Sequence, residues 1–402
     1  MGKFGFCATF CPEMQNCAKD FQKTADIISM DFRQYWLSLI FFIGVIANVF
    51  SDIHIYFFDV GQGNCILLRN EEHAILVDAG GSKKFDEIAE NFKTCLGKSK
   101  IDGMILTHQD MDHTKYVDTI LSSDDKLVGD TYFIFSARPS VGETDLPSVI
   151  FAENCETLRD FSAKSPAVKI EDIQQKLNDL FKEGEFKFLK ANWTSANKKT
   201  NDTCLVFSFE YQGFKILFTG DSTGEALDNY IEQGSPGFTR NPHSAENRAI
   251  IANTHIFVIP HHGSDTDGSW RWALNVVKNS PCLLATIISA NPTIRGYCHP
   301  QSWLVDVPWP KSMSFLCEKH KFYYKRGTDT RELDINERMF TTGLSGASEP
   351  YIEIMIHEGT ITIPNTACPI RLEEIREFQS LVDSRTSSPG TPPSPSPKIP
   401  KK

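Results

Sequence analysis

The densest group of chemistry-bearing side chains is the stretch THQDMDH, which directly follows an apolar run typical of a buried strand. It contains His108, Asp110, Asp112 and His113. Imidazole and carboxylate groups are common ligands of divalent metals. A loop can turn all four side chains toward one or two cations, whereas a helix would distribute them around its axis. A polar turn whose acids cap a following helix is the alternative, but the bracketing histidines favour a metal site.

Three further apolar runs also end in metal-capable side chains, namely Asp78, Asp221 and the adjacent pair His261 and His262. Ligands of open α/β sheets bind at the carboxyl ends of the strands, so we expect these side chains to meet at one sheet edge. Taken singly, Asp221 is also compatible with a turn, and the histidine pair with a helix cap or a surface feature. The sequence leaves open which of the two histidines faces the metal.

The elements that must position these groups alternate between strands and helices. Strands are indicated from Ile53 onward, followed by a helix over 85–96, whose apolar residues recur with helical spacing, and a buried strand at 101–108 that ends in polar residues. Two later strand pairs are joined by Gln-Gly (212–213) and Glu-Gly (358–359) turns. Strand, helix and strand in this order predict a layered α/β fold.

Together these motifs resemble a known family. The loop resembles the metallo-β-lactamase motif His-x-His-x-Asp-His, with Asp110 where the second histidine usually stands. With DVGQGN, ILVDAGG, ILFTGD, PHHGS and GYCHP in this order, residues 53–303 look like the soluble hydrolase domain of the ComEC competence family. The resemblance implies a four-layer αββα metallo-β-lactamase sandwich with its site at one edge.

The resemblance also implies a role for each candidate residue. His108 and Asp110 would hold one metal ion, Asp112 and His113 the other, Asp221 would bridge both, and His261 or His262 would complete the second site. Asp78 would not bind a metal ion itself but would orient the ligand histidines. His299, which is equally compatible with a structural role, would reach the substrate or the leaving group. Asn201 matches a family asparagine near the site.

Two departures from the family pattern matter. No histidine lies between Thr114 and Gly220, so the usual third histidine of the first metal site is missing. That site would depend on His108, Asp110, Asp221 and water, and its carboxylates favour Mn²⁺ over Zn²⁺. Asn64 stands where the ComEC pattern usually has an acid.

These features predict a metal-dependent hydrolase with two divalent ions, Mn²⁺ or Zn²⁺, and with Asp112 and His299 as catalytic residues. A phosphodiesterase or nuclease that uses a water activated by the two metals fits best, with single-stranded DNA as a candidate substrate. One alternative is a hydrolase of a small ester, lactam or phosphocholine-type substrate. Another is a catalytically silent binding protein that keeps the fold. No obligate protein partner is inferred.

Composition and charge limit the partners. The 402 residues carry a formal net charge of −10, which disfavours broad affinity for nucleic acid but not a nuclease with bound cations. The eleven cysteines contain no CxxC pair, so a zinc knuckle is disfavoured, and disulfides and buried thiols stay open.

An apolar run from Trp36 to Ala47 bears on domains and location. It is short for a membrane span and suits a signal peptide or an anchor, with Met30 as the expected start and export from the cytoplasm as the expected outcome. A buried helix in a cytoplasmic protein is the alternative. The expected organisation is an extension (1–29), a signal peptide or anchor (30–51), the hydrolase domain (52–365), and a helix with a disordered Pro-rich tail (366–402).

Overall fold

The computed structural model describes only part of the chain. It covers residues 51–137, 149–153, 155–160, 167–190, 200–228, 244–291, 299–306, 320–326, 329–335, 339–343, 350–363, 370–377 and 380. All of these fall in one compact unit, Ser51–Lys402. The predicted extension, signal peptide or anchor, and Pro-rich tail lie outside the described residues. Within those residues, no helix is both long and apolar enough to cross a membrane.

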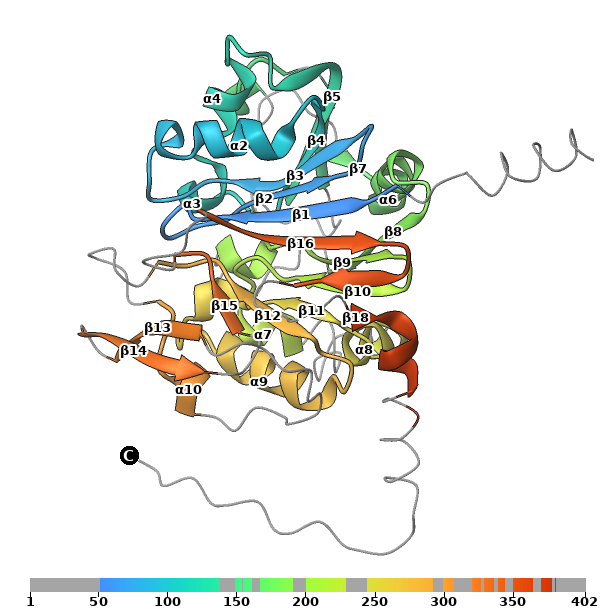
Figure 1. Cartoon of the computed structure of the whole chain (residues 1–402). Coiled ribbons are helices and arrows are strands. Elements are labelled where there is room, and N and C mark those ends of the chain that lie inside the picture. Colours follow the sequence, from blue (N-terminus) through green and yellow to red (C-terminus); the bar gives the residue numbers. More distant parts are fainter. Residues whose placement is uncertain are drawn as a thin grey trace, which may run out of the picture. The chain divides into compact units, whose positions relative to one another are not determined.

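Two large β-sheets form the framework (Figure 1). In spatial order, the described strands of the first sheet are β18 (Ile370–Arg371), β17 (Thr360–Thr362), β16 (Tyr351–His357), β1 (Ile53–Phe58), β2 (Cys65–Arg69), β3 (Ala74–Ala79), β4 (Ile101–Leu106), β5 (Val128–Ala137), β6 (Val149–Glu153) and β7 (Ala167–Val168). Those of the second are β15 (Met339–Thr341), β12 (Ala285–Ile288), β11 (Ile256–Val258), β10 (Phe214–Phe218), β9 (Val206–Tyr211) and β8 (Gly184–Lys190). A separate hairpin pairs β13 (His320–Arg326) with β14 (Asp329–Ile335).

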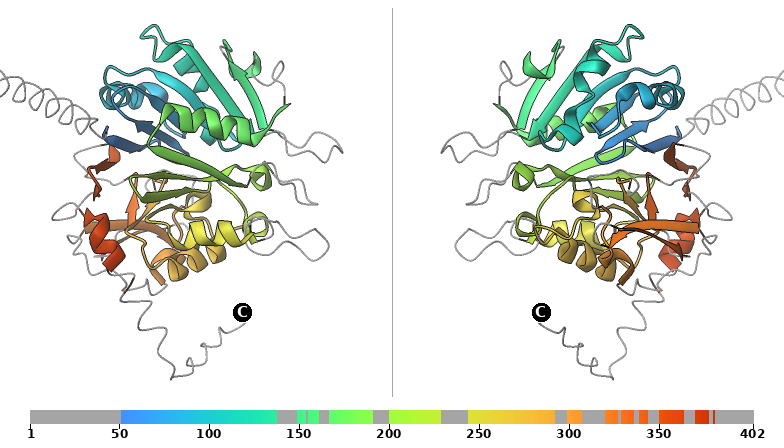
Figure 2. Two further views of the ribbon diagram at one scale, coloured as in Figure 1. Left: turned by 90° about the vertical axis from the view of Figure 1, so that its right-hand side faces the viewer. Right: turned by 90° about the vertical axis from the view of Figure 1, so that its left-hand side faces the viewer.

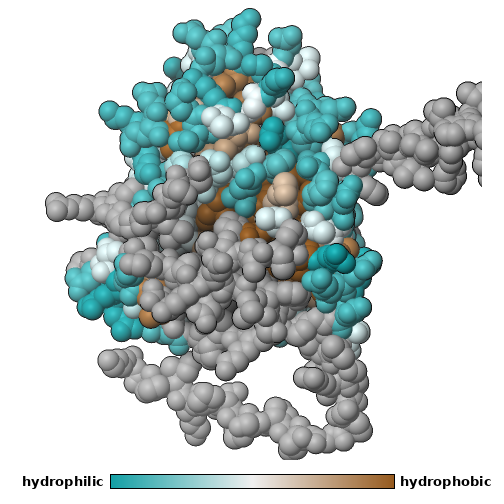
Figure 3. Space-filling model, viewed as in Figure 1, coloured by the Kyte–Doolittle hydropathy of each residue, from teal (hydrophilic) through white to brown (hydrophobic). Residues whose placement is uncertain are grey.

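Helices lie on the outer faces of both sheets, as the two side views show (Figure 2), except for one helix at the side of the sandwich, α6 (Ile170–Leu180), whose Ile173 and Leu177 belong to the core between the sheets. The described helical segments are η1 (Phe85–Glu87), α2 (Ala89–Leu96), α3 (Met111–Thr114), α4 (Val117–Leu121), α6 (Ile170–Leu180), η2 (Thr200–Thr203), α7 (Gly224–Leu227), α8 (Ser244–Ala252), η4 (Pro260–Gly263), α9 (Ser269–Asn279) and α10 (Trp303–Asp306). Figure 3 shows that the outward surface around α2 and α4 is mainly hydrophilic. The predicted four-layer α/β/β/α arrangement is therefore confirmed.

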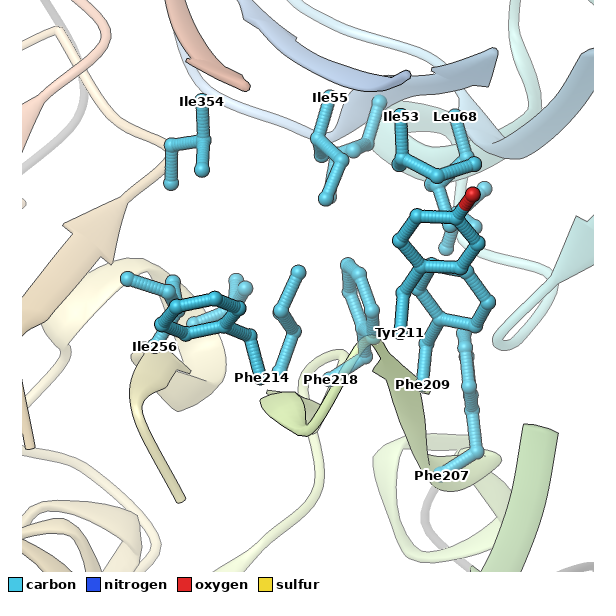
Figure 4. Close-up of a cluster of buried hydrophobic side chains, with 14 of the residues drawn as sticks. Ile53, Ile55, Leu68, Phe207, Phe209, Tyr211, Phe214, Phe218, Ile256 and Ile354 are labelled. Atoms are coloured by element: carbon cyan, nitrogen blue, oxygen red, sulfur yellow. The ribbon is translucent and has the colours of Figure 1, made fainter. Parts of the chain in front are cut away.

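The alternation of side chains explains why the sheets pack in layers. In β1, Ile53, Ile55 and Phe57 belong to the core between the sheets, whereas Tyr56 and Phe58 belong to the core beneath α2 and α4. Successive strand residues point to opposite faces, so one strand serves both cores. Figure 4 shows isoleucine and leucine side chains of the first sheet facing a row of aromatic rings from β9 and β10. Each fully buried side chain of this kind contributes about 1.5–3 kcal/mol.

The two predicted hairpin turns are also confirmed. Gln212 and Gly213 connect β9 to β10 with φ of 49° and 84°, and Glu358 and Gly359 connect β16 to β17 with φ of 46° and 70°. Positive φ at both central residues matches the twist of antiparallel strands, which fixes their register.

Two other expectations concern the cysteines and the end of the domain. Cys65 and Cys155 are buried thiols without a disulfide. Strand β18 follows the expected end of the domain at residue 365 and extends the first sheet.

The sheet topology brings several strand ends to one edge. β3 and β4 run parallel in the first sheet, and β10, β11 and β12 run parallel in the second. The carboxyl ends of β4, β10 and β11 lead directly into the predicted metal ligands, and Asp78 lies near the carboxyl end of β3. A hydrogen bond from the Leu205 amide to the Thr107 carbonyl (2.8 Å) links the two sheets at this edge.

Close backbone approach at this edge predicts the effect of replacing Gly63. Its φ is +131°, and an added Cβ would lie 2.3 Å from the Asp112 carbonyl oxygen. We expect Gly63→Ala to lower the free energy of unfolding by about 3 kcal/mol, through overpacking and backbone strain, and to displace Asp112. Urea denaturation and metal titration measure both effects.

Gly359→Ala is the matched control, because Gly359 also has a positive φ (+70°) but no atom within 4 Å of the added Cβ. It should lose only the strain term, about 1–2 kcal/mol. Equal losses at the two positions, with unchanged metal affinity in both, would show that close approach to Asp112 is unimportant.

Candidate metal centre

Four side chains from distant parts of the sequence converge at the common edge of the two sheets. Asp112, His113, Asp221 and His262 each offer one ligand atom, and these atoms all lie within 4.8 Å of one another. His113, Asp221 and His262 are buried, and Asp112 is partly exposed. We call these four residues the ligand cluster. Its side chains come from the loop after β4, the end of β10 and the end of β11.

The sequence suggested that the THQDMDH motif is a loop. The structure shows that only its first part is a loop. A single helical turn, α3, begins at Met111, and Asp110 precedes it in extended conformation. This turn exposes 72% of Met111 and buries His113 completely. Because the turn is so short, Asp112 and His113 both still contribute a ligand atom to the cluster. The Asn64 amide donates to the Asp112 carbonyl (3.0 Å), which fixes the turn against the first sheet.

His113 is oriented by Asp78, a residue predicted for this role. The Nδ1 atom of His113 lies 2.7 Å from the Asp78 carboxylate, and both groups are fully buried. The amide and hydroxyl of Thr107 also donate to that carboxylate, at 2.7 and 2.9 Å. Asp78 accepts all of these bonds, so His113 carries its proton on Nδ1 and directs Nε2 into the cluster.

His262 is oriented in the same way by a main-chain oxygen. Its Nδ1 donates to the Ser289 carbonyl at the end of β12 (2.7 Å). Its Nε2 therefore also points into the cluster, 3.3 Å from His113 Nε2 and 3.2 Å from an Asp221 oxygen. His261 and His262 both have positive φ, 50° and 54°. Such backbone costs about 1–3 kcal/mol per residue and is typical of functional sites.

The cluster is electrostatically suited to a cation. Burial alone would raise the pKa of Asp221, but attraction to His262 and His113 holds it well below the usual value. Burial would lower the pKa of His262, yet Asp221 and Asp112 raise it to about 9. The same balance, with Asp221 and Asp78 as attracting groups, raises the pKa of His113 well above normal. Protons thus take the place that a divalent ion would fill between two facing imidazoles and a carboxylate.

A second set of predicted ligands borders the cluster. Asp221 turns one oxygen toward His113 (3.1 Å) and the other toward His261 (3.9 Å). His108 lies fully buried, with Nε2 3.5 Å from an oxygen of the more exposed Asp110. The buried nitrogens His108 Nε2 and His261 Nδ1 find no hydrogen-bond partner among the described residues. Unsatisfied buried nitrogens of this kind are costly unless a ligand occupies them.

His299 and Asn201 were both predicted near the site. The structure places His299 beside the ligand cluster, whereas it shows no such contact for Asn201 among the described residues. The His299 ring lies 5.9 Å from the His261 ring and 6.5 Å from the His262 ring, beside the cluster. Its buried Nδ1 has no hydrogen-bond partner among the described residues. Asn201 lies in η2, and none of the contacts described for it reaches the cluster.

Sequence analysis missed two residues that shape the site. Thr107 supports Asp78, and Ser289 supplies the carbonyl that orients His262. Thr107 could have been found from its place as the first residue of the THQDMDH motif, directly before His108. The Ser289 contact is made by the main chain, so its side-chain type gave no signal. Residues that act through backbone atoms are visible only once the two sheets are assembled.

The fold and cluster together define a four-layer α/β protein with a buried site for a divalent metal. Residues 58–126 match the family model of the metallo-beta-lactamase superfamily, and this match contains the whole THQDMDH motif. Over these residues the chain is similar to that superfamily, and this similarity, together with the ligand cluster, supports a metal-dependent hydrolase. No curated protein matches the sequence.

Solved structures with a related fold share little sequence with this chain. One is the metallo-beta-lactamase fold protein YhfI from Bacillus subtilis, with 13% identity, a TM-score of 0.27, and coverage of 56% of this chain and 93% of that one. Another, from Parabacteroides distasonis, is provisionally described as a metal-dependent hydrolase. It has 14% identity, a TM-score of 0.27, and coverage of 59% and 93%. At these TM-scores neither likeness bears on the function of this chain.

The raised histidine pKa values predict how metal affinity depends on pH. A divalent ion must displace the protons of His262 (pKa about 9) and His113. Affinity should therefore fall as pH drops below about 9, by about tenfold per pH unit for each displaced proton. Calorimetric titration with Mn²⁺ and Zn²⁺ at several pH values, in buffers of different ionisation enthalpy, counts the protons released. Binding without proton release would contradict the assignment of these imidazoles as ligands.

Proposed function

We propose that this protein is a metal-dependent phosphodiesterase of the nuclease type, with metal ions held at and beside the ligand cluster. The proposal depends chiefly on one observation, that the two oxygens of Asp221 face different histidines. One oxygen faces His113 and His262, and the other faces His261. A carboxylate placed in this way can bridge two cations. The resemblance to the ComEC hydrolase domain supports the same conclusion.

The first ion would bind Asp112, His113, Asp221 and His262. The second would bind His108, Asp110 and the other oxygen of Asp221, with His261 beside it. The second position has more carboxylate than imidazole character, which favours Mn²⁺ over Zn²⁺. Bound divalent ions supply a nucleophilic water near neutral pH and stabilise negative charge on a phosphoryl group.

The role proposed for His299 is to contact the substrate. Burial, and then the charges of His262 and His261, lower its pKa to about 4. His299 is therefore neutral at pH 7, and it can donate a hydrogen bond without bringing a further positive charge into the site. Its Nδ1, which has no hydrogen-bond partner among the described residues, is available for an oxygen of the phosphodiester or of the leaving group.

Replacement of Asp221 tests the metal centre. Asp221→Asn keeps the size of the side chain but removes the charge that two imidazoles share. We expect loss of stoichiometric metal and a decrease in phosphodiester cleavage of at least about 10³-fold. Elemental analysis and hydrolysis of bis(p-nitrophenyl) phosphate with Mn²⁺ measure these effects. His73→Gln is the control, because His73 is a half-buried histidine that bonds Asp102 away from the cluster.

A substrate panel separates the proposal from its alternatives. A chromogenic ester, a lactam and a phosphocholine ester are assayed beside the phosphodiester. Faster turnover of the ester or lactam by the intact protein would replace the phosphodiesterase proposal with a small-molecule hydrolase. Absence of both metal and turnover would instead identify a silent relative.

Replacement of His299 separates substrate binding from metal binding. His299→Ala removes the unpartnered imidazole and should lower kcat for the phosphodiester by about 10²-fold, the usual effect of losing one transition-state donor. Metal content should stay at the wild-type level, because His299 is not needed to hold either ion. Loss of metal in this variant would show instead that His299 is a ligand.

A further inference from the structure

Two partly buried tryptophans lie next to the loop that carries the histidine pair, and neither is a ligand in the proposed metal centre. The rings of Trp270 and Trp303 have centroids 6.3 Å apart and are tilted by 43°. The Arg271 guanidinium lies 5.1 Å from the Trp270 ring centroid. Together these three side chains form a group of flat surfaces, which we call the tryptophan platform. Indole rings are usually well buried, so two partly exposed ones at a candidate site suggest a ligand surface.

Trp303 is held at a fixed distance from the ligand cluster. Its Nε1 donates to the Gly263 carbonyl (3.0 Å), and Gly263 directly follows His262. The Gln301 amide donates to the same oxygen (3.1 Å). The carbonyl that receives both bonds is therefore one residue from a proposed metal ligand. The Trp303 ring is therefore anchored to the main chain of the loop that carries His262.

Trp270 is connected to the cluster from the other side of the same loop. The Asp267 carboxylate lies 3.9 Å from His261 Nδ1, and the Asp267 carbonyl accepts from the Gly224 amide (2.9 Å). Gly268 then turns the chain with a φ of 75°, and α9 begins at the next residue. Trp270 is thus presented from the first turn of α9, where helix geometry fixes its backbone.

We infer that the tryptophan platform binds a nucleobase of a single-stranded nucleic acid whose phosphodiester lies at the ligand cluster. The inference rests on the proposed phosphodiesterase function and specifies its substrate class. Bases of single strands stack on aromatic rings and on guanidinium planes, whereas bases within a duplex are already stacked. Nucleic acids are phosphodiesters that also carry flat rings able to stack in this way.

Charge at the platform indicates how such a strand binds. Arg271 is exposed, and no carboxylate of the described residues pairs with it. Asp265 and Asp267 are exposed nearby, and the chain as a whole is acidic. Affinity should therefore come from stacking and from the metal centre rather than from neutralised phosphates. The plot of log affinity against log salt should have a slope of about −1 or shallower, as expected for a single phosphate contact.

The test compares a thymidine oligomer with an oligomer of the same length in which the nucleotides are abasic. Cleavage by the full chain with Mn²⁺ gives kcat and KM for each. We expect wild-type KM to be about tenfold lower or more for the thymidine oligomer, consistent with stacking of one base. A uridine oligomer run in parallel distinguishes DNA from RNA.

Ring-specific variants assign the preference to the platform. Trp270→Leu should reduce the KM difference to within about twofold, whereas Trp270→Phe keeps a ring and should retain most of it. Tyr132→Leu is the control: it also removes a half-buried ring, but from β5 near Asp102, at the opposite end of β4 from His108. This control should leave cleavage of both oligomers unchanged.

The outcomes distinguish the platform from the proposed function. Cleavage of both oligomers with equal KM, unaffected by Trp270→Leu, overturns the platform and leaves the phosphodiesterase intact. Cleavage of neither oligomer, with metal bound, overturns the phosphodiesterase and the platform with it. A base preference that disappears in Trp270→Leu and persists in Trp270→Phe supports the platform.

Discussion

The buried carboxylate of Asp221, shared between the inward-facing nitrogens of His113 and His262, is the interaction on which the site depends. Both imidazoles donate through Nδ1 to fixed acceptors, Asp78 and the Ser289 carbonyl, so both must present Nε2 to the same small volume. Two facing lone pairs beside a carboxylate are unfavourable without a positive charge between them. The arrangement therefore requires either bound protons or a bound cation.

The two-sheet sandwich imposes this arrangement, because each sheet supplies two of the four residues of the ligand cluster. One sheet supplies Asp112 and His113 through the loop after β4, and the other supplies Asp221 and His262 through β10 and β11. The aromatic and aliphatic core between the sheets holds these two halves together (Figure 4). Glycines at the junction allow main chains to approach closely, as at Gly80, where a Cβ would lie 2.4 Å from the Asp112 carbonyl carbon. The packing of the core therefore holds the two like-charged imidazoles and the strained residues in place.

Backbone strain is present at three residues of the site. Asp78, His261 and His262 all have positive φ although none is glycine. Such conformations persist only where the surroundings determine them, and here burial and hydrogen bonds do so for Asp78 and His262. The same rigid loop carries the Gly263 carbonyl that holds Trp303, so the metal centre and the tryptophan platform share one support. A substrate that contacts both would meet surfaces whose separation is already fixed.

The sequence by itself determined the layered fold, the strand ends and the metal-capable residues, because these depend on local periodicity and on residue types at short spacing. THQDMDH, the two hairpin turns and Asp78 were all recognisable in this way. It left open the choice between His261 and His262, and only the assembled structure puts His262 in the cluster and His261 beside it. Tertiary structure also decided that α3 begins inside the motif, that the Ser289 carbonyl orients His262, and that Trp270 meets Trp303. These features depend on main-chain atoms and on contacts between segments far apart in the chain, which leave no pattern in the residue types.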